Sequence, residues 1–138
     1  MKESIRYHRL PLSGIDAMTA VSSRAFPRHT HDQYGIGVVD AGGHASWSGR
    51  GQVEAGPGCF ICVNPGEVHD GRAVGYRGRS WRILYLEPAL MAELCTDVHE
   101  NLSTTWMFSA PVFADRDLRQ SFEQAFSHSG AGCKDAMA

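Results

Sequence analysis

The sequence contains three histidines whose imidazole side chains and spacing could form a metal- or ligand-binding site. His29 and His31 stand one residue apart, and His69 follows the Pro65-Gly66 turn. On an extended segment, residues i and i+2 point to the same side, so His29 and His31 present two imidazoles to one face. With His69 as a third ligand and open positions for substrate, such a group suits Fe, Mn, Ni, Cu or Zn. The spacing alone leaves a second interpretation open, in which these histidines are hydrogen-bonded wall residues or are exposed on strands.

Short strands must position these side chains. Up to about residue 86, glycine- and proline-rich turns divide the chain into short apolar runs. This pattern indicates an all-β sandwich or barrel. No helix-period pattern interrupts it, which disfavours a parallel α/β sheet. The predicted strands cover residues 4–9, 16–25, 34–40, 44–48, 52–55, 59–63 and 81–87.

The character of the chain changes at Pro88. Residues 89–94 predict a short helix, with proline in its first turn. A second helix is predicted within residues 113–128, where Asp115 is a suitable N-cap. One face of this helix carries an apolar stripe of Leu118, Phe122 and Phe126. The stripe either packs on this chain's own barrel or forms the seam of a homodimer.

Length and charge limit the classes of protein. The 138 residues predict one domain, with residues 1–88 as a barrel and residues 89–138 as a helical segment ending in a truncated linker. Thirteen Lys and Arg against fifteen Asp and Glu give a net charge of −2, without the basic face that nucleic-acid binding needs. No apolar run is long enough to span a bilayer, and the N-terminus lacks the apolar core of a secretion signal. We therefore expect a cytoplasmic location and no membrane contact.

The chain has four cysteines, Cys59, Cys62, Cys95 and Cys133. Cys59 and Cys62 have the spacing of a zinc knuckle or a redox pair. On the predicted strand 59–63, however, residues three apart point to opposite faces, so the two sulfurs cannot share one metal ion. A disulfide framework is not expected in a cytoplasmic chain. We expect buried free thiols instead.

The two histidine stretches together resemble the paired motifs of the cupin superfamily. Residues 29–31 match its H-x-H element, and residues 66–69 match its later glycine-to-histidine element. The glutamate ligand of that family would fall on Gly35 or Ile36, neither of which can coordinate a metal. Asp32 is close, but on a regular strand it points away from the two histidines. Loss of the anionic ligand weakens a divalent-metal site.

A more specific resemblance covers residues 26–90. The string AGPGCFICVNPGEVHDG, followed by WRILYLEP, is similar to the N-terminal effector-binding domain of AraC-type transcriptional regulators. This resemblance implies a jelly-roll barrel of the cupin double-stranded β-helix type that holds a small-molecule effector, followed by C-terminal helices that form a homodimer. In such regulators two helix-turn-helix units follow. We expect DNA binding only through that C-terminal half, which is absent from this sequence.

A sensing barrel needs apolar walls and a few polar groups that orient the ligand. Trp81, Ile83 and Tyr85 alternate on one face of the predicted strand 81–87, and aromatic rings there can stack on a sugar or on a small organic acid or aromatic effector. The candidate effector-binding residues are His29, His31, Tyr34, Trp47, His69, Trp81, Arg82, Ile83 and Tyr85. Ordinary core packing is the alternative for each aromatic residue.

Arginines flank the two histidine elements at Arg28, Arg72, Arg79 and Arg82. Any of them can clamp a carboxylate, although solvated loop arginines are the alternative. Glu67 is expected to accept backbone N–H groups of its own turn rather than to act as a general acid.

Two functions compete. The first is effector sensing and dimerisation for a regulator, with no catalytic residue and no required cofactor. The second is a stand-alone metal-dependent cupin enzyme, a dioxygenase or isomerase. In that enzyme His29, His31 and His69 would hold a divalent metal that acts as a Lewis acid or activates O2. The missing carboxylate ligand and the lack of an evident general base beside the histidines favour sensing.

Overall fold

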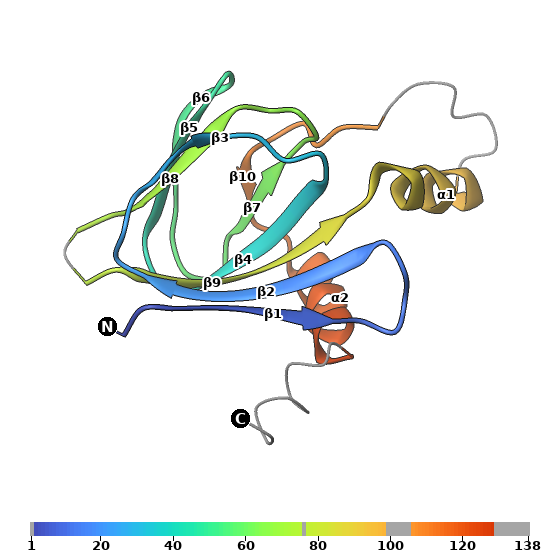
Figure 1. The fold of residues 1–138 in the computed structure, drawn as a ribbon, viewed down its shortest axis with the longest axis horizontal. Coiled ribbons are helices and arrows are strands. Elements are labelled where there is room, and N and C mark those ends of the chain that lie inside the picture. The colour runs from blue at the N-terminus through green and yellow to red at the C-terminus, as the bar shows by residue number, and fades with distance from the viewer. Residues whose placement is uncertain (1, 76, 99–105, 129–138) are drawn as a thin grey trace.

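The computed structural model describes residues 2–75, 77–98 and 106–128. In these residues the chain forms ten strands and two helices (Figure 1). The strands are β1 (Ser4–Arg9), β2 (Ile15–Ser22), β3 (Phe26–His29), β4 (Tyr34–Gly42), β5 (His44–Ser48), β6 (Gly51–Ala55), β7 (Phe60–Val63), β8 (His69–Ala73), β9 (Arg79–Leu86) and β10 (Val112–Phe113). The helices are α1 (Pro88–Val98) and α2 (Arg116–Ser127).

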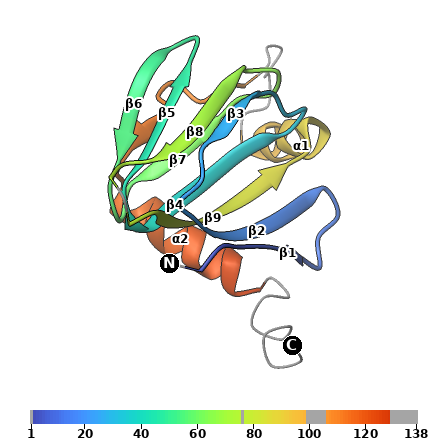
Figure 2. The ribbon, with the colours of Figure 1, turned by 60° about the vertical axis from the view of Figure 1, so that its left-hand side comes forward.

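The strands form two antiparallel sheets. The larger sheet has the order β1-β2-β9-β4-β7-β10, and the smaller has the order β3-β8-β5-β6. Figure 2 shows the smaller sheet facing the larger one, with α2 below the larger sheet. Neighbours such as β4 and β9 are distant in sequence, as in a double-sheet jelly roll. The all-β jelly-roll barrel with C-terminal helices predicted from the sequence is confirmed.

Alternation along β9 separates the two faces of the larger sheet. Trp81, Ile83 and Tyr85 point between the sheets and line the cavity there. Leu84 and Leu86 point to the opposite face, where they belong to the main hydrophobic cluster. Because successive side chains of a strand alternate between faces, one strand supplies both the cavity wall and the outer core.

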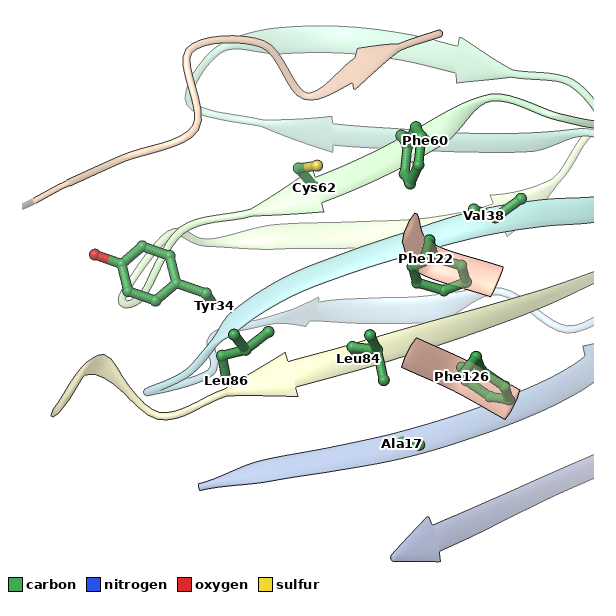
Figure 3. Close-up of a cluster of buried hydrophobic side chains, with 9 residues drawn as sticks. All are labelled: Ala17, Tyr34, Val38, Phe60, Cys62, Leu84, Leu86, Phe122 and Phe126. Carbon is green, nitrogen blue, oxygen red and sulfur yellow. The ribbon is translucent and has the colours of Figure 1, made fainter. Parts of the chain in front are cut away.

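The outer core lies between the larger sheet and α2. Figure 3 shows Phe122 and Phe126 of α2 over Val38 of β4 and Leu84 of β9. The two rings are only 4% and 7% exposed. The predicted N-cap is confirmed, because the Asp115 side chain accepts the N–H of Leu118 at 2.9 Å. Helix α2 and β10 thus belong to the same packed structure as the strands that precede residue 88.

Three strands were not predicted from the sequence: β3, β8 and β10. Strand β3 contains Pro27, and β8 reads HDGRA, so neither has the β-branched and aromatic content that marks strands. Pairing of β3 with β8, rather than local preference, makes both of them strands. Strand β2 also ends earlier than predicted, at Ser22.

The cysteine prediction holds for one of the two residues of the C-x2-C pair. Cys62 is buried on β7, and this burial raises the pKa of its thiol to about 12. Cys59 precedes β7 and is half-buried; it is a free thiol, as Cys62 is. Cys133 and the predicted linker at residues 129–138 lie outside the described residues. None of the described helices is long and apolar enough to cross a membrane.

Candidate functional site

The three histidines predicted from the sequence meet at one end of the barrel. One ring nitrogen from each of His29, His31 and His69 lies within 4.8 Å of the others. The register between β3 and β8 causes this convergence, because it places His29 directly opposite His69. The turn before β8 is tied to His31, whose carbonyl accepts the N–H of Gly66 at 2.8 Å. The three imidazoles can therefore hold one metal ion.

Hydrogen bonds to the backbone orient two of these imidazoles. The Nδ1 of His29 donates to the carbonyl oxygen of Pro27 at 2.6 Å. The Nδ1 of His69 donates to the carbonyl oxygen of Glu67 at 3.0 Å. A carbonyl oxygen only accepts, so each proton sits on Nδ1 and the lone pair stays on Nε2. Metal-binding histidines commonly carry this type of outer hydrogen bond.

The electrostatics favour neutral imidazoles at His31 and His69. Burial lowers the pKa of His31, and the neighbouring His69 and His29 lower it further. Burial also lowers the pKa of His69, although its hydrogen bond to Glu67 opposes this shift. Neutral imidazole is the form that binds a metal or accepts a hydrogen bond from a ligand.

No acidic side chain joins the cluster in the part of the chain that the structure describes. Of Gly35 and Ile36, the two positions on which the cupin resemblance places a glutamate ligand, only Gly35 lines the cavity. A Cβ on Gly35 would lie 2.8 Å from Val63 Cγ2 and 3.4 Å from Tyr85 Cε1, so these side chains occupy the space a glutamate would need. Asp32 is exposed. The donor set is thus three imidazoles, which fits a metal but binds it more weakly than a set with a carboxylate.

A cavity of about 200 Å³ extends from the histidines between the two sheets. A cavity of about 150 Å³ is known to hold benzene, so this one has room for a small molecule of about one ring. The lining residues named in the sequence-based predictions are His29, His31, His69, Trp81, Ile83 and Tyr85. The lining residues that the predictions missed include Met18, Phe26, His44, Ser46, Ile61 and Gly71.

Three of the predicted effector-binding residues, Tyr34, Trp47 and Arg82, are not among the residues that line the cavity. Tyr34 is buried in the outer core, and its hydroxyl donates to the carbonyl oxygen of Trp106. Trp47 lies under the guanidinium of Arg28, whose central carbon is 3.9 Å from the ring centre. Arg82 forms ion pairs with Asp40 and Glu123 on the outer face.

The apolar stripe of α2, which the sequence allows either to pack internally or to form a dimer seam, packs within this chain. Phe122 and Phe126 are buried against this chain's own larger sheet, and Leu118 packs on the same cluster (Figure 3). These rings are therefore not available to a second copy. Of the two alternatives that the sequence left open, the structure supports internal packing.

A signal for some of the missed lining residues was present in the sequence. His44 and Ser46 alternate on the predicted strand 44–48, so one face of that strand carries both. The alternation did not indicate which face is internal. Phe26 had no such signal, because its strand was not recognised.

The turn that carries His69 is held by hydrogen bonds among the buried Asn64 and the half-buried Arg50 and Glu67. Glu67 accepts the Arg50 guanidinium through both oxygens, at 2.7 and 3.0 Å, and accepts the N–H of Asn64 at 3.1 Å. The role expected for Glu67, an acceptor for its own turn, is confirmed. The Asn64 side chain in turn exchanges hydrogen bonds with the backbone of Phe108. A rigid turn of this kind holds the His69 backbone in place.

Comparison with known proteins identifies the family. The model of the AraC-like ligand binding domain matches residues 13–137. The chain belongs to this family. No curated protein sequence matches this AraC-like domain at a significant level.

Solved structures show that this AraC-like domain has the cupin fold. Oxalate decarboxylase from Bacillus subtilis matches with a TM-score of 0.55 and 13% identity, over 83% of this chain and 38% of that one. A cupin-2 domain protein from Shewanella frigidimarina matches with a TM-score of 0.50 and 14% identity, over 58% of this chain and 79% of that one. The AraC-like domain thus spans well under half the length of the decarboxylase chain. At these identities the likeness concerns the fold alone.

Proposed function

We propose that this chain is the effector-sensing domain of an AraC-type transcriptional regulator and that it binds a small molecule in the barrel cavity. The cavity of about 200 Å³, found in a chain of this family, is the observation that carries the proposal. Apolar walls with a few converging polar groups are usual for small-molecule sites. DNA contacts would belong to helix-turn-helix units outside these residues, and such a regulator would act in the cytoplasm.

Two features of the site favour sensing over catalysis. The three histidines have no carboxylate partner among the residues that the structure describes, and the space for one at Gly35 is occupied by Val63 and Tyr85. A metal held by imidazoles alone binds less tightly, which suits a site where the ligand itself supplies part of the binding energy.

A ligand screen with a blocked cavity tests the proposal. Purified protein is screened by thermal unfolding against sugars, small organic acids, amides and aromatic compounds. A ligand at a hundred times its Kd should stabilise the protein by about 2.7 kcal/mol. Ile83→Trp fills the cavity and should abolish this stabilisation, whereas Leu12→Trp, at a residue 51% exposed, should leave it unchanged. Stabilisation that survives Ile83→Trp, or no stabilising ligand in the whole set, would count against the proposal.

Dimerisation and domain division form part of the same proposal. Residues 1–88 would form the effector-binding barrel, and residues 89–138 would support it and lead to the DNA-binding half. A homodimer would use surfaces other than the buried rings of Phe122 and Phe126. Sedimentation of the chain at tens of micromolar, with and without a ligand from the screen, tests this part. A single-chain mass under both conditions would remove the dimer from the proposal.

A metal-dependent cupin enzyme is the second candidate, because three imidazoles converge and two of them have Nε2 lone pairs set by backbone hydrogen bonds. Oxalate decarboxylase from Bacillus subtilis, which shares the fold, has Mn(II) centres. A bound metal would supply Lewis acidity or O2 activation. Metal analysis after loading with Mn²⁺, Ni²⁺ or Zn²⁺ tests this candidate. One ion per chain, lost in His69→Ala and kept in His128→Ala, together with turnover of a substrate, would favour the enzyme.

A further inference from the structure

The inner face of β1 carries exposed apolar side chains that belong to the wall of the cavity. Ile5 and Tyr7 both line the cavity, although they are 42% and 71% exposed. Strand β1 is the edge of the six-stranded sheet, whereas the sheet that faces it has only four strands (Figure 2). The cavity therefore continues, on this side, onto an apolar surface of β1 that solvent reaches.

Strand register connects Tyr7 with the interior of the barrel. Tyr7 pairs with Met18 of β2, and Met18 pairs with Ile83 of β9. Residues directly opposite one another on paired strands share a face, and all three of these line the cavity. The next residue, His8, points to the other face, where its ring centre lies 6.1 Å from that of Phe126. An apolar row thus runs from Ile83 to Tyr7 at the edge of the sheet.

The distance across this row favours an elongated ligand. Neighbouring strands lie about 4.8 Å apart, so β1 lies roughly 10 Å from β9. Tyr85 is two residues along β9 from Ile83 and on the same face, and its ring centre lies 5.3 Å from that of His31. A ligand that contacts both the histidine cluster and Tyr7 must therefore extend over roughly 10 Å.

The histidine end of the row offers hydrogen-bond acceptors. The Nδ1 atoms of His29 and His69 donate to backbone carbonyl oxygens, which leaves the lone pair of each neutral ring on Nε2. One ring nitrogen from each of the three histidines lies within 4.8 Å of the others, so a single group can reach more than one ring. A hydroxyl or N–H group of a ligand is the matching donor.

The cavity lining offers no free partner for a charged ligand among the described residues. None of the four arginines expected to clamp a carboxylate lines it: Arg28, Arg72, Arg79 and Arg82. No lysine lines it either. Asp70, the only acidic residue of this lining, already accepts the N–H of Trp47 at 2.7 Å. An ionised ligand would lose its hydration here without gaining an ion pair, which is costly.

We propose that the effector is an uncharged, elongated molecule with a hydrogen-bond-donating head at the three histidines and an apolar tail that leaves the barrel over Met18 and Tyr7. The tail would cover the exposed rings and methyl groups of β1 and remove that apolar surface from water. The continuity of this surface with the cavity assigns it to the ligand. This inference rests on the proposed function, since it specifies the ligand class of the same cavity.

Two homologous series of neutral alcohols test the inference. They are 4-ethylphenol, 4-butylphenol and 4-hexylphenol, and 1-butanol, 1-hexanol and 1-octanol. Each compound is titrated calorimetrically at pH 7 into the whole chain after metal removal with a chelator. A fully buried methylene tightens binding about fourfold, so the longest member of at least one series should bind tenfold or more tighter than its shortest. The methyl ethers of these compounds, which lack the donor, should bind at least tenfold more weakly.

Tyr7→Ser tests the path of the tail. Because Tyr7 is 71% exposed, its replacement should leave the fold intact. The gain in affinity from the shortest to the longest member should fall at least threefold in this variant, while the shortest member should bind as in the wild type. Leu12→Ser is the matched control, because Leu12 is an exposed apolar residue outside the cavity lining. This control should keep the full gain.

Several outcomes would overturn the assignment. Affinity that does not rise along either series, or that rises equally in the wild type and in Tyr7→Ser, would remove the tail from β1. Methyl ethers that bind as tightly as their alcohols would remove the donor head. Tighter binding of 4-butylbenzoate or 4-butylbenzylammonium than of 4-butylphenol would show that the ligand is charged, and no binding in either series would also end the inference. Binding of compact compounds that Ile83→Trp blocks, without any gain from a tail, would end this inference alone, and the proposed sensing function would stand.

Discussion

Arg82 of β9 and Glu123 of α2 form a two-point ion pair across the outer core. The Nη1 and Nη2 atoms of Arg82 donate to the two carboxylate oxygens of Glu123 at 2.6 and 2.8 Å. Arg82 also donates to both oxygens of Asp40 on β4, each at 2.8 Å. Its neighbours Trp81 and Ile83 face the cavity. Residues that line the cavity and the residue that holds α2 therefore alternate along one strand.

Loss of the Glu123 carboxylate should reduce stability in a pH-dependent way. Hydrogen bonds from Arg82 hold the pKa of Glu123 at about 2, below its ordinary value of 4.5. The stabilisation is thus present above about pH 4.5 and is lost as the pH falls toward 2. Because the side chain is 41% exposed, solvent screening limits the effect of Glu123→Gln to about 1 kcal/mol at pH 7. Urea unfolding of the wild type and of Glu123→Gln, from pH 7 to pH 3, measures the difference in their free energies of unfolding.

The matched control for that experiment is Glu54→Gln, at an exposed position on β6. This substitution should change the free energy of unfolding at pH 7 by less than about 0.5 kcal/mol. If Glu123→Gln lowers the free energy of unfolding by the same amount at every pH down to pH 3, the ion-pair explanation is contradicted.

Phe122→Ala should destabilise the single chain. The ring is 4% exposed and packs with its centre 5.9 Å from that of Phe60 and 5.7 Å from that of Phe126. Removal of such a buried ring costs about 3–5 kcal/mol. Because the partners belong to the same chain, the loss should be equal at protein concentrations tenfold apart. A loss that changes with concentration would instead indicate a dimer seam, and the exposed Gln120→Ala on α2 is the control.

Gly66→Ala should be destabilising through the backbone alone. Gly66 has a φ of +77°, and no atom lies within 4 Å of an added Cβ. Left-handed backbone costs a non-glycine residue roughly 1–2 kcal/mol. Gly49→Ala, also in open space but without positive φ, is the control and should cost less. Equal thermal unfolding midpoints for the two variants would rule out the conformational explanation.

His44 should make stability fall in acid. Its pKa is about 4 in the folded chain and 6.5 as the ordinary value, chiefly because burial disfavours the charged ring. Below pH 6.5 the unfolded chain takes up a proton that the folded chain does not, so stability decreases as the pH falls from 6.5 to 4. This group alone accounts for up to about 3 kcal/mol. His44→Gln should flatten the pH profile of unfolding, and the exposed His128→Gln should leave it unchanged.

Much of the fold was predictable because its signals are local. Glycine and proline turns mark the ends of β1, β4, β5 and β6, and Asp115 marks the start of α2. Alternation along residues 81–86 correctly separated Trp81, Ile83 and Tyr85 from Leu84 and Leu86.

Other features depend on contacts between distant residues. A strand pattern defines two faces but does not indicate which of them is internal. The sequence therefore predicts cavity positions for Tyr34 and Arg82, whereas α1, α2 and residues 106–113 cover that side of the sheet. The burial of Arg79 depends on β8 and β5 closing over it, which no local pattern predicts.

The sequence by itself determined that His29 and His31 share one face, because alternation is a property of the extended chain. Only the tertiary structure decided that His69 meets them, because the register of β3 against β8 sets that contact. The same pairing places Phe26 opposite Gly71. Side-chain periodicity is local and can be read along the chain, whereas strand register and sheet closure arise from packing the whole barrel.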